Sequence, residues 1–139
     1  DPAETAKWHK MLFDPPPVMA ELVPTSEKVA QEWKYTTEPT GDWPKGEAKG
    51  EWKTGKGGFG SKGTPGAVIG TEWTAREISL TREFDLKELP AGEVYLRFHC
   101  DEDGEVFLNG VPAAKLPGYT TGYTEMPISA EAQKALKAG

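Results

Sequence analysis

The sequence predicts a small all-β sandwich that forms a single domain. The chain has 139 residues, which is the usual length of a domain with one hydrophobic core. Hydrophobic residues make up only 37%, while 16 glycines and 12 prolines exceed ordinary usage. This composition favours short elements joined by many turns. Alternation of apolar and polar residues at 78–86 and 94–100 adds the period of two that half-buried strands show.

Charge and hydropathy exclude two classes of partner. The first 70 residues carry 9 Lys and Arg against 10 Asp and Glu, and the remaining 69 carry 7 against 12. Because the phosphate backbone is bound by clustered cations, we expect no nucleic acid at the acidic C-terminal half. No apolar run approaches the roughly 20 residues that span a bilayer, so we expect no membrane insertion. The single cysteine, Cys100, cannot form an internal disulfide and is expected to be a buried thiol.

Residues 1–24 are expected to form a lead-in segment or linker, and residues 25–139 the sandwich domain. Trp8, Met11 and Leu12 have helical spacing, but the prolines at 15–17 stop any helix. The apolar residues could dock on a neighbouring domain or pack on their own domain, and the sequence leaves both open. The start at Asp1 lacks an initiator Met and a signal peptide, which favours a processed piece of a longer protein.

Residues 36–66 are expected to be looped backbone fixed by aromatic anchors. Nine glycines and three prolines fall in these 31 residues, around Trp43, Trp52 and Phe59. Residues 55–60 satisfy the pattern G-x-G-x-x-G. A dinucleotide-binding motif must follow a buried strand and open a helix, which residues 61–65 cannot start. We therefore expect no nucleotide site here.

Two later stretches predict strands. In residues 71–86 one side of the alternation is apolar, and the side chains expected to be buried are Ile78, Leu80, Phe84 and Leu86. Residues 94–100 alternate in the same way, and an acidic turn at 101–104 leads into residues 106–108. This order predicts two antiparallel strands joined by the turn.

Two short sequence signals predict a hairpin turn and a helix in the C-terminal third of the chain. Asn109 and Gly110 form the pair that most strongly indicates a type I′ hairpin, because both central residues of that turn need positive φ. Ser129 is a good N-cap and Glu131 suits a first turn, so we expect a short helix at about residues 130–136.

No catalytic or metal constellation is visible in the sequence. Glycosidases use two carboxylates across a cleft, usually from different elements, whereas Asp101, Glu102 and Asp103 are adjacent in a turn. We expect these carboxylates to be solvated, with a calcium site on the turn as the minor alternative. His9 and His99 lie far apart, without the histidine or cysteine cluster that zinc requires. We therefore expect no catalytic residue and no cofactor.

Several segments carry a resemblance to a known family. They are residues 78–86, 94–98, 105–111 and the Gly-Tyr-Thr loop at 118–120. In this order they resemble the galactose-binding-like domains, especially the sugar-binding domain of glycoside hydrolase family 2 enzymes. The stretches around Trp33, Trp43, Trp52, 57–60 and 70–73 also look like modules attached to large secreted bacterial glycan-processing proteins. The resemblance covers about residues 33–139.

The resemblance implies a two-sheet antiparallel jelly-roll sandwich, with the catalytic acids of any parent enzyme in another domain. It also implies a secreted, periplasmic or cell-surface location, with carbohydrate and other domains or chains of the parent protein as partners. Such domains normally continue after the short helix with a further strand. We therefore expect this jelly roll to lack its last strand, which another polypeptide, a swapped copy or sequence lost by cleavage would supply.

These observations predict a non-catalytic carbohydrate-binding or accessory module. Trp73, Tyr119 and Tyr123 are the expected stacking surface, and Arg76 the expected hydrogen-bond donor, because sugars need flat aromatic rings and directed polar groups. The alternative is a structural protein–protein interaction domain whose aromatics pack internally and whose open sheet edge docks a partner. An autonomous glycosidase is the least favoured interpretation.

Overall fold

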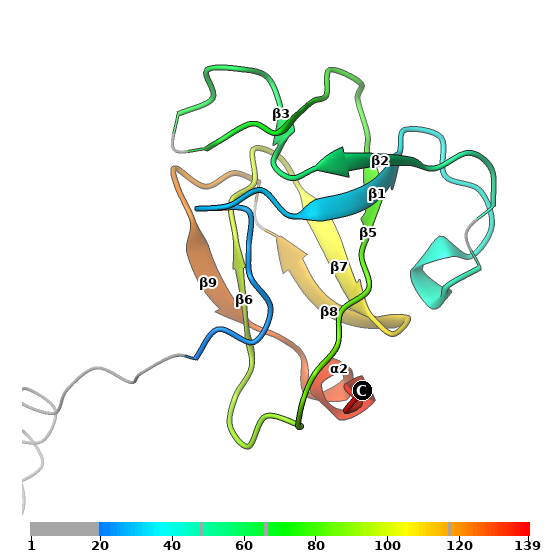
Figure 1. Ribbon diagram of the computed structural model, residues 1–139, viewed down its shortest axis with the longest axis vertical. Helices are drawn as coiled ribbons and strands as arrows, with labels where there is room; N and C mark the ends of the chain where they lie inside the picture. The colour runs from blue at the N-terminus through cyan, green and yellow to red at the C-terminus, as the bar shows by residue number, and fades with distance from the viewer. Residues whose placement is uncertain (1–19, 48, 66, 117) are drawn as a thin grey trace, which may run out of the picture.

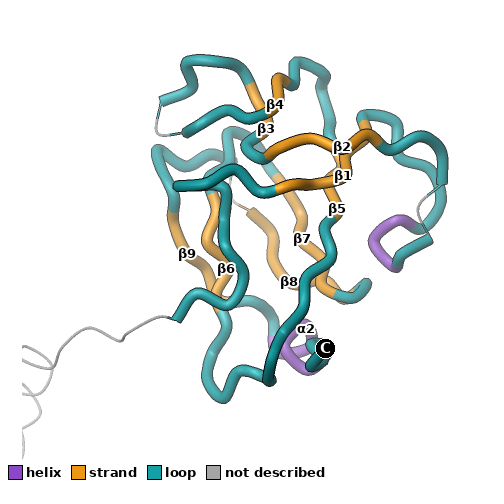
Figure 2. Tube along the Cα trace, in the orientation of Figure 1, coloured by secondary structure: helices purple, strands orange, loops and turns teal. Residues whose placement is uncertain are grey.

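The structure is a computed structural model that describes residues 20–47, 49–65, 67–116 and 118–139. The helix expected near Trp8 lies outside these residues. The strands within them are β1 (Glu32–Thr36), β2 (Lys53–Lys56), β3 (Phe59–Gly60), β4 (Thr71–Glu72), β5 (Ser79–Thr81), β6 (Tyr95–Phe98), β7 (Gly104–Leu108), β8 (Val111–Leu116) and β9 (Thr124–Pro127). A 3₁₀ turn, η1 (Trp43–Lys45), and a helix, α2 (Ala130–Ala135), complete the regular structure of these described residues. The prediction of a β-rich chain with one short helix near its C-terminal end is confirmed (Figure 2).

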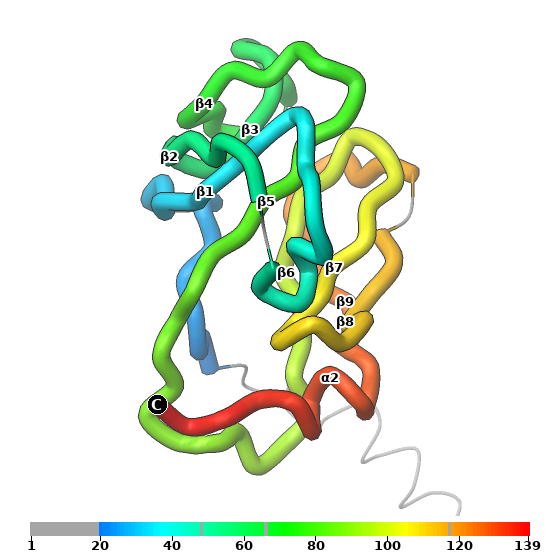
Figure 3. Tube along the Cα trace, turned by 90° about the vertical axis from the view of Figure 1, so that its right-hand side faces the viewer, coloured from blue at the N-terminus to red at the C-terminus, as the bar shows by residue number. Residues whose placement is uncertain are grey.

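The strands pair in four groups. One is a three-stranded antiparallel sheet of order β2-β1-β5, and β3 and β4 form a short parallel pair. The other two are the antiparallel pairs β6–β9 and β7–β8. Figure 3 shows β2-β1-β5 on one side of the molecule and the pairs β6–β9 and β7–β8 on the other. This two-sided arrangement is compatible with a sandwich.

The hairpin β7–β8 and helix α2 form where their sequence signals predicted them. Asn109 and Gly110 have φ values of 49° and 80°, as a type I′ turn requires. Ser129 Oγ accepts a hydrogen bond from the Ala132 N–H at 3.1 Å and so caps α2. Asn109 Nδ2 also donates to the Ala135 carbonyl oxygen at 2.7 Å, so the hairpin turn holds the end of the helix.

The prediction that residues 94–100 and 106–108 form one hairpin is wrong. β6 pairs with β9, with Leu96 opposite Met126, whereas β7 pairs with β8. The exposed acidic residues 101–103 therefore connect two different strand pairs. Alternation shows that a segment is a strand with one buried face, but it does not specify the partner.

The buried face predicted for residues 78–86 is only partly correct. β5 ends at Thr81, so the regular alternation does not continue beyond it. As a result Phe84 is 38% exposed, while Leu86 is buried. Ser79, predicted to face solvent, is also buried, and it pairs with the buried Thr36 of β1.

The core lies around β6, β8 and α2. Its buried hydrophobic members among the described residues are Leu86, Phe98, Ala113, Ala132 and Leu136. Cys100, expected to be buried, is half-buried, and desolvation raises the pKa of its thiol. The Gly139 N–H donates to the Leu86 carbonyl oxygen at 2.8 Å, so the end of α2 and its following residues lie against the segment after β5 (Figure 1). Within the described ranges, no helix has the length and apolar character needed to cross a bilayer.

Candidate functional site

Three of the residues predicted to bind sugar differ in exposure and contacts. Trp73 follows β4, where its backbone N–H donates to the Gly60 carbonyl oxygen at 3.0 Å. Its buried indole Nε1 has no hydrogen-bond partner among the residues that the structure describes. Arg76 is exposed and, with Glu38, lines a shallow hollow of about 380 Å³. Tyr119 is 71% exposed.

Tyr123, the fourth predicted residue, packs with His99 and Arg97. Its ring lies 5.8 Å from the His99 ring, and the Arg97 guanidinium lies 5.7 Å from its centroid. Desolvation raises the pKa of the Tyr123 hydroxyl. Within the described part of the chain, no ring or charge contact joins Tyr123 to the other three predicted residues. The sugar-binding surface of these four residues stays a prediction.

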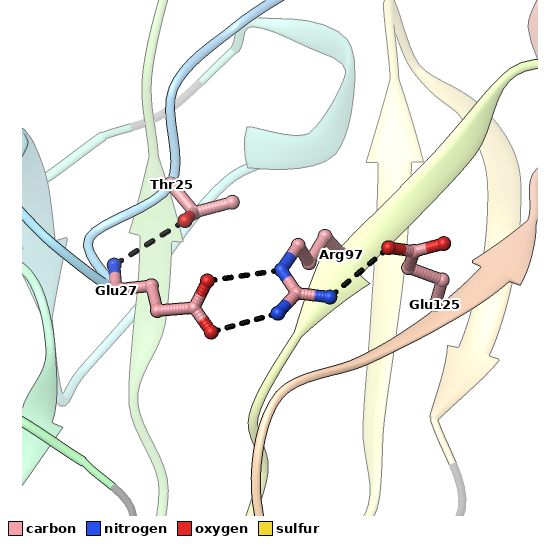
Figure 4. Close-up of polar contacts among 4 residues, drawn as sticks. All are labelled: Thr25, Glu27, Arg97 and Glu125. Atoms are coloured by element: carbon pink, nitrogen blue, oxygen red, sulfur yellow. Dashed lines mark hydrogen bonds and ion pairs between the residues drawn. The ribbon is translucent and has the colours of Figure 1, made fainter. Parts of the chain in front are cut away.

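Arg97 of β6 binds two carboxylates (Figure 4). Its Nε and Nη2 donate to Oε1 and Oε2 of Glu27 at 3.1 and 2.8 Å, which is a bidentate ion pair. Its Nη1 donates to Oε1 of Glu125, the residue opposite it on β9, at 3.0 Å. Thr25 Oγ1 accepts from the Glu27 N–H at 3.2 Å and helps to orient that residue.

The contacts of Arg97 favour a structural role over acid–base catalysis. The hydrogen bonds from Arg97 lower the pKa of Glu27, and the bond to Glu27 raises the pKa of Arg97. A general acid at neutral pH needs a carboxyl whose pKa is raised, so Glu27 has the opposite property. Among the residues described here, no three His, Cys, Asp or Glu side chains are placed to hold a metal ion. The geometry suits a contact that fastens the segment before β1 to β6.

Three half-buried aromatic side chains gather beside the β7–β8 hairpin. The Trp43 ring of η1 lies 5.9 Å from the Trp52 ring, with an interplanar angle of 52°. It also lies 6.4 Å from the Phe107 ring of β7, edge-on at 76°. All three side chains remain partly exposed. We name Trp43, Trp52 and Phe107 the aromatic platform.

The loop between β1 and β2 fixes the two tryptophans of the platform. Gly46 caps the C-terminal end of η1, since its φ of 87° is left-handed and its N–H donates to the Trp43 carbonyl oxygen. A β-bridge between Thr40 and Lys49 closes the loop. Trp52 Nε1 donates to the Lys49 carbonyl oxygen at 3.2 Å, so this indole is oriented by a hydrogen bond as well as by packing.

Polar groups border the aromatic platform. Lys45 Nζ lies 3.4 Å from Asp42 Oδ2, and the two side chains are 66% and 46% exposed. Lys45 also lies against the hairpin turn, because a Cβ placed on Gly110 would be 2.9 Å from Lys45 Cγ. An exposed donor and an exposed acceptor therefore lie in the same turn of the chain as Trp43. Such a combination suits a ligand that offers both C–H faces and hydroxyl groups.

The glycine-rich residues 55–60 serve close backbone packing. They join β2 to β3, without the helix that a dinucleotide site requires. Gly57 is buried, and a Cβ there would lie 2.4 Å from Ser26 Oγ. A Cβ on Gly70 would lie 2.5 Å from the Gly57 carbonyl oxygen. Only residues without a side chain allow these segments to approach so closely.

Sequence reasoning missed the two arrangements that the structure makes prominent. Trp43 and Trp52 were interpreted as loop anchors, and two tryptophans in a loop rich in glycine and proline were the available signal for a platform. No signal pointed to Phe107 as their neighbour or to the pairing of Arg97 with Glu27, because these contacts join distant parts of the chain. Comparison of the chain with models of known protein families, with curated proteins and with solved structures finds no match.

Proposed function

We propose that this chain is a non-catalytic carbohydrate-binding module and that the aromatic platform is its sugar-contacting surface. In this proposal the fold is an antiparallel jelly roll, and the module belongs to a larger extracytoplasmic glycan-processing protein. The resemblance of residues 33–139 to galactose-binding-like domains supports this class of function. The catalytic residues of the parent protein would then lie in another domain.

The observation that carries the proposal is the partial exposure of two tilted indole rings, one of which packs on the β7–β8 hairpin. Trp43 and Trp52 are neither fully buried nor detached, since each keeps exposed surface while packing against an aromatic neighbour. A rigid, flat and partly exposed ring stacks on the C–H face of a sugar at little conformational cost. The charged pair of Asp42 and Lys45 offers acceptors and donors to sugar hydroxyls.

A glycan array followed by isothermal titration tests the proposal. The wild-type chain should bind at least one glycan reproducibly, and Trp43→Ala and Trp52→Ala should each weaken binding severalfold to about tenfold, since an aromatic stacking contact contributes roughly 0.5–1.5 kcal/mol. Circular dichroism establishes that each variant folds. Trp73→Ala is the matched control, because Trp73 belongs to the surface predicted from the sequence. Binding that is lost in Trp73→Ala but retained in both platform variants would move the site to that surface.

A second candidate function is a structural domain that docks another protein. Large apolar side chains are exposed at several places, with Val29 69%, Val68 64% and Leu89 56% accessible. Leu89 also lines a hollow of about 360 Å³ beside α2, together with Pro90 and Leu136. Scattered apolar residues are common on protein surfaces, whereas a hollow with apolar residues side by side in its lining is the feature that favours docking. A uniformly negative glycan array with a folded chain would favour this function over the first.

A further inference from the structure

The tip of the β7–β8 hairpin holds the single asparagine of the chain, and a glycine follows it. Asn109 and Gly110 form the turn between the two strands. The Asn109 side chain is exposed, so water reaches its amide. Among the described residues the Gly110 N–H donates no hydrogen bond, and glycine has no side chain to shield its nitrogen. An amide carbon and an unhindered backbone nitrogen are thus neighbours in an exposed turn.

These two groups can react with loss of ammonia. The Gly110 nitrogen attacks Cγ of Asn109, so that a new C–N bond closes a succinimide ring while the bond from Cγ to the side-chain nitrogen breaks. The proton of the Gly110 N–H leaves with the amide group as ammonia. Water then opens the ring at either carbonyl, which leaves an aspartate or an isoaspartate in place of the asparagine. No electrons are transferred, and water is the one co-reactant.

The amide that this reaction removes fastens α2 to the hairpin. Asn109 Nδ2 donates to the carbonyl oxygen of Ala135, the last residue of α2, at 2.7 Å. A carboxylate has no donor, so acceptor oxygens would face each other after the reaction. Carbonyl groups at the C-terminal end of a helix also carry partial negative charge, which adds repulsion. Lys45, whose side chain lies against Gly110, offers the new carboxylate a cation outside the helix. The contact between the turn and α2 would therefore be lost.

The helix that depends on this contact contributes to the hydrophobic core. Ala132 and Leu136 are buried, with 0% and 8% of their surface exposed. α2 has 6 residues, and a helix of this length is stable only through contacts outside itself. These contacts include the Ser129 cap at its start and the Asn109 bond at its end. Loss of the Asn109 bond should therefore loosen the last turn of α2.

We propose that Asn109 is a deamidation site and that its conversion to aspartate releases the C-terminal end of α2. The bond to Ala135 and the left-handed φ of 49° hold the Asn109 amide in place, so the reaction proceeds from molecules in which this end of α2 has opened. Loss of ammonia makes each conversion one-way, so the converted form accumulates with time. This inference does not depend on the proposed sugar binding.

Mass spectrometry of the chain incubated at mildly alkaline pH tests the modification site. Trypsin releases residues 98–115 as a peptide in which Asn109 has the only side-chain amide, so the mass change from amide to acid reports this site alone. The folded wild type should convert severalfold more slowly than the chain unfolded in urea. Ser129→Ala, which removes the cap of α2 and folds by circular dichroism, should convert severalfold faster than the wild type. An unconverted peptide in the folded wild type, once the unfolded chain has converted, would overturn the proposal.

Amide hydrogen exchange tests the consequence for α2. Asn109→Asp has the sequence of the aspartate product, and Asn109→Gly is its control, because glycine suits the left-handed turn and removes the donor without adding a charge. The Leu136 N–H, which donates to the Gln133 carbonyl oxygen, should exchange severalfold faster in Asn109→Asp than in the wild type, and faster than in Asn109→Gly. Amides of β7 and β8 should exchange as before.

Equal exchange at Leu136 in Asn109→Asp and the wild type would contradict release of α2. If Asn109→Asp does not fold, the deamidation rates of the wild type and Ser129→Ala give the decision. Equal rates in these two folded chains would show that α2 does not control Asn109 and would overturn the link between them.

Discussion

The β7–β8 hairpin with α2 and the segment 24–31 with β1 are organised in opposite ways. We name residues 24–31 the strap. In the first region, residues close in sequence decide the structure: Asn109 and Gly110 make the turn, and Ser129 caps the helix that follows. In the second region, Glu27 and Gln31 depend on Arg97 and Arg82 from β6 and from the end of β5. Local signals thus build the first region, whereas long-range polar contacts hold the second. The two regions should therefore respond differently to substitution, salt and pH.

The largest effect is expected in the hairpin turn. Gly110 has a φ of +80°, and a Cβ there would meet Lys45 Cγ at 2.9 Å and Cα at 3.3 Å. Gly110→Ala should lower the free energy of unfolding by about 2–4 kcal/mol, because it adds a steric clash to left-handed strain. Urea unfolding measures the change.

Gly63→Ala is the matched control for the hairpin substitution. Gly63 has a similar φ of +86°, but a Cβ there would meet nothing within 4 Å. Gly63→Ala should therefore lower the free energy of unfolding by only about 1–2 kcal/mol, which is the conformational cost alone. Equal losses in the two variants would show that packing of Lys45 on the turn contributes nothing.

A smaller loss is expected at the start of α2. Ser129 Oγ accepts from the Ala132 N–H and donates to the Pro112 carbonyl oxygen at 2.7 Å. Ser129→Ala should lower the free energy of unfolding by about 1–2 kcal/mol because it removes both hydrogen bonds. Ser129→Asp keeps an acceptor for the helix but has no donor for Pro112, so its loss should be smaller. Thermal unfolding of the two variants separates these contributions.

The strap should loosen without destabilising the hairpin. Glu27→Gln removes the ion pair to Arg97, so we expect amide exchange at Gly57, which donates to Gln31, to accelerate severalfold in NMR hydrogen-exchange experiments. Amides of β7 and β8 should exchange as in the wild type. Glu88→Gln alters an exposed carboxylate that has no ion pair in the described structure, and it should leave Gly57 unchanged. Faster exchange throughout the sheet would contradict a separate strap.

The smallest effect concerns pH. Arg97 lowers the pKa of Glu27 below its ordinary value of 4.5, so the strap contact is complete above that value. It is lost as the pH falls through the lowered pKa, because protonated Glu27 no longer pairs with the guanidinium. Protection of the Gly57 amide, corrected for intrinsic exchange, should therefore decrease in the wild type as the pH falls below 4.5 and through the lowered pKa of Glu27. In Glu27→Gln the protection of the Gly57 amide should not change over the same range of pH.

The same contrast explains how far the sequence predicts the structure. The hairpin turn and α2 were predicted at their positions, because each depends on the backbone preferences of a few adjacent residues. The pairing of β6 was predicted wrongly, since its partner β9 follows two intervening strands. Phe84 was expected inside because alternation was extended beyond Thr81, where β5 ends.

The candidate site was less predictable than the fold. Trp43 and Trp52 could be recognised as unusual residues for a loop, but their packing on Phe107 depends on how that loop folds back over β7. Tyr123, chosen as a stacking residue, lies instead beside His99 and Arg97. Aromatic composition predicts that a binding surface is available, whereas tertiary contacts decide which rings share it.

NMR of the tryptophan indole N–H groups tests the proposed function most directly. The chain has five tryptophans, so each indole gives a separate probe when the ¹⁵N-labelled protein is titrated with the glycan that the array identifies. Sugar binding at the aromatic platform predicts that the resonances of Trp43 and Trp52 shift with ligand while that of Trp33 stays in place. Shifts confined to Trp73, or no indole shift at saturation of binding, would contradict the platform as the sugar-binding surface.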